Sequence, residues 1–178
     1  MLLLVALVVG LLGGIATGGK LGNLANVRFR WPLFVIAALV IREVAVIRPF
    51  SGIEGVQYVY ALSLAALVAW TIWHVNRLPG AWLVAAGAGL NLTVVLANGS
   101  RMPVAPALAA TLVKHGHIGQ YTVMGPDTQL NWLADWIGVP GPLGGAYSPG
   151  DLVVAVGIGL MAWLATRQTS QESPRDLD

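Results

Sequence analysis

Five apolar segments separated by polar stretches constrain the fold of this chain more than any other feature. They cover residues 2–16, 31–47, 55–74, 81–97 and 151–166. A helix needs about 20 apolar residues to cross the hydrocarbon core of a bilayer, and these segments come close to that length. Because backbone polar groups inside a membrane must be paired within the segment, such segments fold as helices. The sequence predicts an all-α, polytopic membrane bundle of about five transmembrane helices.

Charged residues are too few for a water-soluble protein of this size. Only 18 of the 178 residues carry a formal charge, whereas 56% are hydrophobic. A soluble domain is about one quarter charged, so a soluble enzyme and a disordered chain are excluded. No run of Lys or Arg is present to bind a nucleic acid. Cysteine is absent, and His115 and His117 have no further ligand nearby in sequence, so we expect no metal and no cofactor.

The chain is expected to form one transmembrane domain, residues 1–166, followed by a polar tail, residues 167–178. Residues 98–150, between the fourth and fifth apolar segments, are too polar to span a membrane. Two short interfacial helices are predicted there. One covers residues 106–115, with Pro106 in its first turn, and the other covers residues 128–137, with Trp132 and Trp136 four residues apart.

The basic residues predict an orientation in the membrane. Placing the N-terminus outside puts six of the ten basic residues on the cytoplasmic side and four on the outer side, which agrees with the positive-inside rule. The cytoplasmic set is Lys20, Arg28, Arg30, Arg77, Arg167 and Arg175, and the outer set is Arg42, Arg48, Arg101 and Lys114. The 98–150 segment is then outside, and the C-terminus is cytoplasmic.

Four polar residues in or next to the apolar segments are candidate ligand or polar contacts, because burying such groups without partners is costly. Arg42 either extends toward the outer interface or contributes to a site, and Glu43 faces an interhelical cavity or binds a proton or cation. Asn91 lies among small residues and is expected to form a hydrogen bond between the fourth and fifth apolar helices, which predicts that these two helices pack together. Arg101, at the outer end of the fourth segment, could hold a lipid headgroup or a substrate carbonyl.

Asp135 and Asp151 both fall on the predicted outer face and form a candidate catalytic pair. Two carboxyl groups brought together can share a proton, which is what an aspartyl peptidase requires. Structural roles compete with this interpretation. Asp151 lies three residues after Ser148 in a capping-box pattern at a helix start, and Asp135 could be a solvent-facing residue of an amphipathic helix.

Short runs along most of the chain, in the same order, resemble a family of small bacterial membrane proteins of actinobacteria and clostridia. The runs are Gly18-Gly19-Lys20-Leu21, Asn76-Arg77-Leu78-Pro79-Gly80, Asn91-Leu92-Thr93, Asn98-Gly99-Ser100-Arg101-Met102-Pro103-Val104, Leu133-Ala134-Asp135-Trp136-Ile137 and Ser148-Pro149-Gly150-Asp151. The domain of that family has no known function. The resemblance implies a multi-pass protein of the bacterial inner membrane and implies no activity.

A second resemblance, over about the last half of the chain, concerns mechanism. Asp135-Trp136-Ile137 and Tyr147-Ser148-Pro149-Gly150-Asp151 look like the two aspartate motifs of lipoprotein signal peptidases. This likeness implies catalytic roles for Asp135 and Asp151. The chain departs from that family in three ways: Ser148 stands where Asn is expected, no Asp-Arg pair follows Asn91, and five apolar segments replace four helices.

The leading expectation is an integral membrane protein without chemistry of its own, acting as a binding, transport-linked or accessory subunit. Its expected partners are the lipid bilayer, other membrane subunits, and a small ligand or lipid. The shortage of catalytic groups motivates this expectation, because thiols are absent and no His has an acidic partner in motif spacing. The alternative is an intramembrane aspartyl peptidase-like hydrolase that uses the outward-facing pair Asp135 and Asp151.

Overall fold

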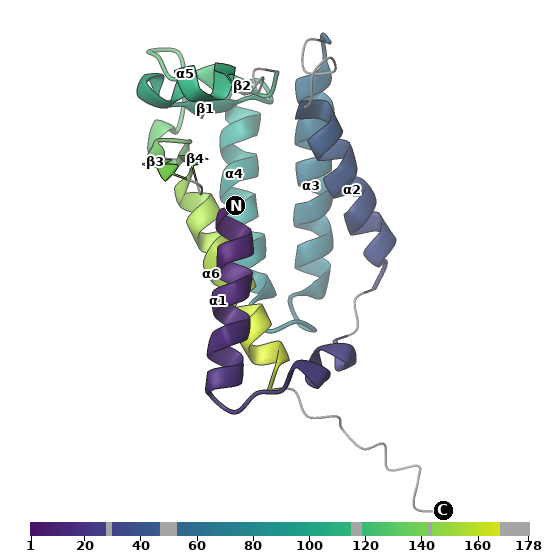
Figure 1. Ribbon diagram of the computed structural model, residues 1–178. Helices are drawn as coiled ribbons and strands as arrows, with labels where there is room; N and C mark the ends of the chain where they lie inside the picture. The colour runs from purple at the N-terminus through teal and green to yellow at the C-terminus, as the bar shows by residue number, and fades with distance from the viewer. Residues whose placement is uncertain (28–29, 47–52, 115–118, 142–143, 168–178) are drawn as a thin grey trace, which may run out of the picture.

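The computed structural model describes residues 1–27, 30–46, 53–114, 119–141 and 144–167. It is mostly helical, with a few short strands. All five apolar segments form long helices, which run side by side in Figure 1: α1 (Leu2–Ala16), α2 (Pro32–Val46), α3 (Val56–His74), α4 (Ala81–Ala97) and α6 (Pro149–Ala165). Their bounds agree closely with the apolar segments because long, mainly apolar runs satisfy their backbone groups as helices.

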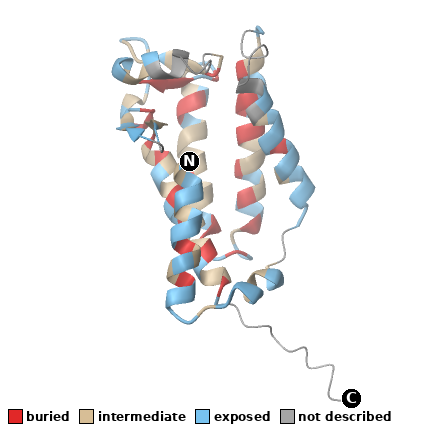
Figure 2. Cartoon of the chain, viewed as in Figure 1, coloured by how far each residue is buried: buried red, intermediate tan, exposed pale blue. Residues whose placement is uncertain are grey.

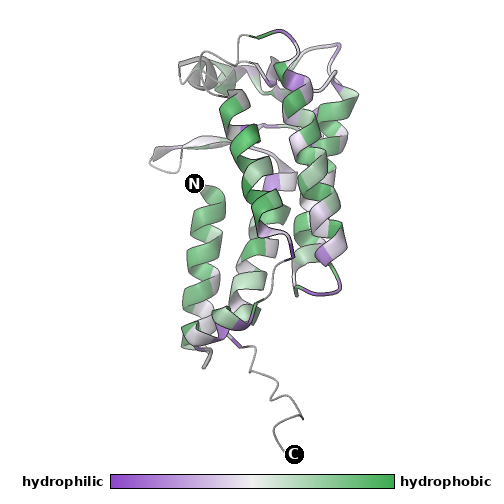
Figure 3. Cartoon of the chain, turned by 90° about the vertical axis from the view of Figure 1, so that its right-hand side faces the viewer, coloured by the Kyte–Doolittle hydropathy of each residue, from purple (hydrophilic) through white to green (hydrophobic). Residues whose placement is uncertain are grey.

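Length separates one of these helices from the others. In the described part of the chain, α3 is the single helix both long and apolar enough to cross a membrane. Helix α3 has 19 residues. The shorter helices are also apolar, and α1 has 15 residues whereas α4 and α6 have 17 each. Figure 3 shows hydrophobic residues along the helices and hydrophilic residues gathered in the connections at their ends.

Close contacts between small residues hold α1, α4 and α6 together. A Cβ atom added at Gly10 of α1 would overlap the carbonyl oxygen of Gly159 of α6, and one added at Gly87 of α4 would overlap the backbone of Gly150. The predicted packing of α4 against α6 is therefore confirmed. Gly159 of α6 lies against α1, whereas Gly150 and Gly157 of α6 make the close contacts with α4.

Helices α2 and α3 form a second pair, joined to the rest of the bundle by contacts between α3 and α4 (Figure 1). Apolar side chains on their outer faces are exposed, including Leu33 of α2 at 78% and Leu62 of α3 at 70%. The burial pattern in Figure 2 agrees, because exposed residues cover much of α1 and α2 while buried residues follow one side of α3.

The segment that joins α4 to α6, residues 98–148, is named the cap segment here, and it contains most of the non-helical structure. Strand β1 (Met102–Val104) pairs in parallel with β2 (Tyr121–Val123), and α5 (Pro106–Lys114) forms the crossover between them. Strands β3 (Ile137–Val139) and β4 (Gly145–Tyr147) form an antiparallel pair. Figure 1 shows β1, β2 and α5 lying across the C-terminal end of α4. These strands correct the expectation of an entirely α-helical fold.

One of the two short helices predicted in this segment is present and the other is not. Helix α5 matches the predicted 106–115 helix, although His115 and His117 lie outside the described residues. The predicted 128–137 helix is wrong: the chain forms a single 3-10 turn, η3 (Asn131–Leu133), and then enters β3. Pairing with β1 overrides helix formation, because the Asp135 N–H donates to the Pro103 carbonyl and the Asp135 carbonyl accepts from Ala105.

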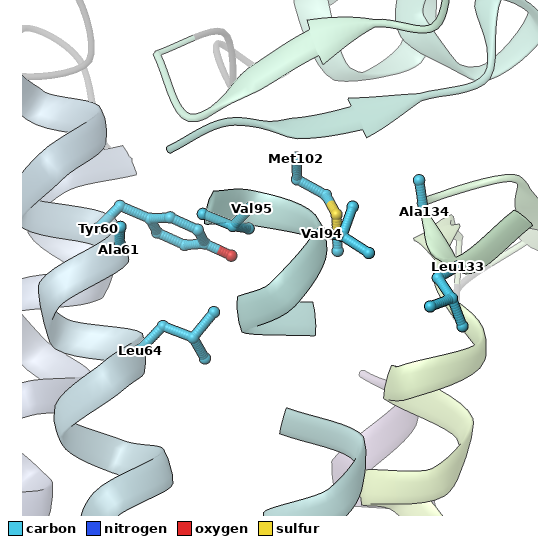
Figure 4. Close-up of a cluster of buried hydrophobic side chains, with 8 residues drawn as sticks. All are labelled: Tyr60, Ala61, Leu64, Val94, Val95, Met102, Leu133 and Ala134. Atoms are coloured by element: carbon cyan, nitrogen blue, oxygen red, sulfur yellow. The ribbon is translucent and has the colours of Figure 1, made fainter. Parts of the chain in front are cut away.

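The hydrophobic core lies where α3, α4 and the cap segment meet. Its buried members come from three parts of the chain, as the close-up in Figure 4 shows: Tyr60, Ala61, Leu64, Val94, Val95, Met102, Leu133 and Ala134. The core therefore sits at one end of the bundle and holds the cap segment against it. The polar residue that follows Leu133 and Ala134 in sequence, Asp135, is buried beside this core.

Candidate functional site

Asp135 is buried at this end of the bundle, directly after the core residues Leu133 and Ala134. Both backbone polar groups of Asp135 are hydrogen-bonded. Its N–H donates to the Pro103 carbonyl over 3.0 Å, and its carbonyl accepts from the Ala105 N–H over 2.9 Å. The residue is 4% exposed, which excludes the solvent-facing position considered for it. Its carboxyl oxygen Oδ1 is buried and has no hydrogen-bond partner among the described residues. A rigid backbone thus holds an incompletely satisfied carboxyl group in the interior.

Asp151 occupies the first turn of α6, and both of its carboxyl oxygens accept hydrogen bonds. Its backbone N–H donates to Ser148 Oγ over 2.9 Å, and the Ser148 N–H donates back to Asp151 Oδ2 over 3.0 Å. This is the capping box expected from the sequence. The other oxygen, Oδ1, accepts from Asn91 Nδ2 over 2.8 Å.

Asn91 joins α4 to the start of α6 as expected. Its amide nitrogen Nδ2 donates to Asp151, and its oxygen Oδ1 accepts from the Ser148 hydroxyl over 2.8 Å. Asn91 lies within α4, whereas Asp151 lies in the first turn of α6. The C-terminal end of α4 lies six residues, or about one and a half turns, past Asn91. Asn91 and Asp151 meet because α6 begins at the level of Asn91 and not at the end of α4.

The two aspartates lie close enough to affect each other electrostatically. Burial is the largest cause that raises the pKa of Asp135 from 3.8 to about 8, and the negative charge of Asp151 raises it further. The positive charge of Arg42 acts in the opposite direction. At neutral pH, Asp135 is therefore mainly protonated and can donate a hydrogen bond.

Arg42 of α2 supplies the positive charge. Its guanidinium carbon lies 5.4 Å from the centre of the Tyr60 ring, and Tyr60 is buried in α3. Arg42 thus faces the neighbouring helix and Asp135, which corrects the expectation that it extends toward the outer interface along α2. The side chain of Glu43 lies outside the described residues. Arg101 is exposed and is not part of this group.

Three residues around Asp135 were not identified from the sequence: the buried Tyr60 and Gln120 and the partly buried Tyr121. Gln120 is 2% exposed, and its carbonyl accepts from the Met102 N–H over 2.8 Å, which fixes it beside β1. The Tyr121 hydroxyl accepts a hydrogen bond from the Gln120 side chain and lies within electrostatic range of Asp135. Burial raises the pKa of Tyr121 above its ordinary value. Nothing in the local sequence indicated that residues 120–121 would pair with β1.

We name this group the Asp135 cluster. It brings together side chains from α2, α3, α6 and two parts of the cap segment: Arg42, Tyr60, Gln120, Tyr121, Asp135 and Asp151. The described residues contain no group of three His, Cys, Asp or Glu side chains that could hold a metal ion. Chemically, the cluster offers one carboxyl group that exchanges a proton near neutral pH and one carboxylate that is already hydrogen-bonded.

Comparison with known proteins identifies the family of the chain without an activity. A model described as a family of unknown function, DUF5317, matches residues 26–163, which is more than three quarters of the 178 residues. Asn91, Asp135 and Asp151 all lie within the matched range. No curated protein and no solved structure matches the chain. The expected resemblance to a domain of unknown function is confirmed, and the bacterial and multi-pass character of that family stays a prediction.

Proposed function

We propose that this chain, which belongs to the DUF5317 family of unknown function, is a multi-pass protein of the bacterial inner membrane. In this proposal it binds a small ligand at the Asp135 cluster. In this proposal the protein catalyses no reaction, and it acts as a binding, transport-linked or accessory subunit of a membrane complex. The N-terminus and the cap segment are outside, and the C-terminal tail is cytoplasmic. The ligand therefore reaches the cluster from the outer side.

Exposed apolar surface supports the membrane location. Side chains such as Val9 of α1, Leu33 of α2 and Leu62 of α3 are more than 60% exposed, although each would be costly to leave in water. Lipid is the solvent that such a surface favours. Among the described residues, one helix reaches the length expected of a full span, so the multi-pass arrangement depends on the shorter apolar helices crossing as well.

A single observation supports ligand binding most directly: the buried Asp135 carboxyl group has an oxygen without a partner. Each buried polar atom that lacks a hydrogen bond costs about 1–3 kcal/mol, and backbone hydrogen bonds to Pro103 and Ala105 hold Asp135 at this buried position. Asp151, in contrast, is fully hydrogen-bonded to Ser148 and Asn91. A ligand with a hydrogen-bond donor or a positive charge would remove the cost at Asp135 only.

The hydrolase alternative is supported by a different observation, the unequal environments of the two aspartates. Asp135 would act as the protonated carboxyl group and Asp151 as the ionised one, which is the division that an aspartyl peptidase uses. Asp151 would first have to release a hydrogen bond, because Ser148 and Asn91 occupy both of its oxygens. This requirement makes binding without catalysis the better-supported function.

Purification in mild detergent followed by native mass spectrometry tests the proposal. The wild-type protein is expected to carry a small molecule or a partner subunit, and Asp135→Asn is expected to lose the small molecule. Asp127→Asn is the matched control, because Asp127 is an exposed aspartate of the same cap segment. A wild-type monomer that carries neither ligand nor partner would contradict the proposal. Cleavage of a membrane-protein substrate that depends on both Asp135 and Asp151 would favour the hydrolase.

Cysteine labelling tests the orientation, and the chain is suited to it because it has no cysteine of its own. A single cysteine at Gln129, in the cap segment, is expected to react with a membrane-impermeant maleimide added outside intact cells. A single cysteine at Ser170, in the tail, is expected to react only after the membrane is opened. Labelling of the Gln129 position only from the cytoplasmic side would refute the orientation.

A further inference from the structure

The buried atoms without partners in the cap segment have one chemical property in common. Three side-chain oxygens are buried without a hydrogen-bond partner among the described residues: Gln120 Oε1, Asn131 Oδ1 and Asp135 Oδ1. The one other such atom is Nε of Arg42, whose guanidinium group has further interactions. The amide oxygens of Gln120 and Asn131 are hydrogen-bond acceptors, and Asp135 Oδ1 is an acceptor whenever its carboxyl group is ionised. The missing group is therefore a donor or a cation.

Gln120 and Asp135 are held on opposite sides of the same short strand. The Gln120 carbonyl accepts from Met102 of β1, and the Asp135 N–H donates to Pro103, the next residue of β1. Tyr121 lies within electrostatic range of Asp135 and accepts a hydrogen bond from Gln120, so it connects the two. Both side chains are at least 96% buried. Gln120 thus provides a second buried, unpartnered oxygen, which Tyr121 connects to the Asp135 cluster independently of the charges.

The charges around Asp135 favour one added positive charge. Within the described part of the chain, four ionisable groups face it: Arg42 from α2, Tyr60 from α3, Tyr121 from β2 and Asp151 from α6. Both tyrosines are neutral near pH 7. With Asp135 protonated, Arg42 and Asp151 cancel and the cluster is neutral. With Asp135 ionised, the cluster carries one net negative charge, which a monovalent cation cancels.

We propose that the Asp135 cluster binds a monovalent cation, either an inorganic ion or a protonated primary amine, in exchange for the proton of the Asp135 carboxyl group. This inference rests on the proposed function and names the chemistry of its ligand. The exchange is balanced, because one proton leaves to solvent as one cation enters and the net charge of the site stays at zero. An anion is disfavoured, because it would meet the Asp151 carboxylate and would bring no donor to Asp135 Oδ1 or Gln120 Oε1.

Release of the Asp135 proton is the direct measurement. Purified protein in nanodiscs, in weakly buffered solution at pH 8 with a pH-indicator dye, is mixed at constant ionic strength with sodium, potassium, methylammonium or choline chloride. Choline is a quaternary cation without an N–H group and serves as the ionic-strength control. Release by sodium or potassium alone identifies an inorganic ion, and release by methylammonium alone identifies an amine. At ten times its dissociation constant, the bound cation is expected to lower the titration midpoint of Asp135 by about one pH unit.

Two variants and a second readout keep the test independent of folding. Asp135→Asn should release no proton, whereas Asp127→Asn should release as much as the wild type. Infrared difference spectra should show loss of a protonated-carboxyl band when the cation is added, and the band should be missing in Asp135→Asn. Equal release with choline, no release from the wild type, or release that persists in Asp135→Asn would overturn the inference. A neutral ligand that co-purifies with the wild type, together with no proton release, would overturn it while the proposed function stands.

Discussion

Replacing Asp135 with Asn is expected to stabilise the protein at neutral pH, although Asp135 is central to the proposed site. The pKa of Asp135 is raised from 3.8 to about 8 in the folded protein, chiefly by burial. An acid whose pKa is raised by folding contributes most stability below pH 4, where it is protonated in both states. That contribution falls as the pH rises, because the unfolded chain releases its proton first, and the fall ends near pH 8.

The size of the effect follows from the pKa difference. Each unit between the two pKa values is worth about 1.4 kcal/mol, so at pH 7 the wild type has lost about 4 kcal/mol of unfolding free energy. The Asn variant avoids this loss because its amide does not ionise. The amide also brings N–H donors that need partners, at a cost of about 1–3 kcal/mol. The net gain for Asp135→Asn at pH 7 is then about 1–3 kcal/mol.

Thermal unfolding in detergent, followed from pH 4 to pH 9, measures this effect. For a chain of this length, the wild-type Tm should fall by roughly 3–5 °C per pH unit up to about pH 8. The Tm of Asp135→Asn should change much less and should exceed that of the wild type at pH 7. Asp127→Asn, which removes an exposed carboxylate, should follow the wild type. A wild-type Tm that is constant from pH 5 to pH 8, or an Asn variant with the same slope, would refute the reasoning.

Two further predictions concern the helix contacts. Asn91→Ala removes both side-chain hydrogen bonds between α4 and the start of α6, including the bond to Ser148. It should lower the unfolding free energy by about 1–3 kcal/mol in the same thermal assay. An unchanged Tm would show that these bonds do not stabilise the bundle. Gly10→Ala should lower the Tm because its Cβ would overlap Gly159. Gly13→Ala, on the same helix with open space around it, should leave the Tm unchanged or raise it. Equal effects of the two substitutions would contradict the α1–α6 packing.

The helices and their caps were predictable because local signals decide them. Apolar length alone located all five long helices, and the Ser148–Asp151 spacing located the start of α6. The apparent helix at 128–137 failed because its Trp132 and Trp136 spacing is equally compatible with one tight turn, in which Trp136 Nε1 donates to the Trp132 carbonyl. Pairing of Asp135 with β1 then decides the outcome, and that contact lies more than 30 residues away in sequence.

The candidate site was predictable only in part for the same reason. Asp135, Asp151, Asn91 and Arg42 stood out because polar groups are rare in this sequence. Gln120 did not, because its burial depends on the parallel pairing of β1 with β2 across α5, and three-residue strands leave no clear periodic pattern.

The short helices described above have a consequence for the lipids around the protein. At 1.5 Å per residue, α1 is about 22 Å long and α4 and α6 are about 25 Å long, against a hydrocarbon core of about 30 Å. In the proposed multi-pass arrangement, the bilayer must thin beside these helices. Lipids with shorter or more disordered acyl chains would therefore gather around α1 and α6, and the protein would be concentrated in the thinnest regions of the membrane that contains it.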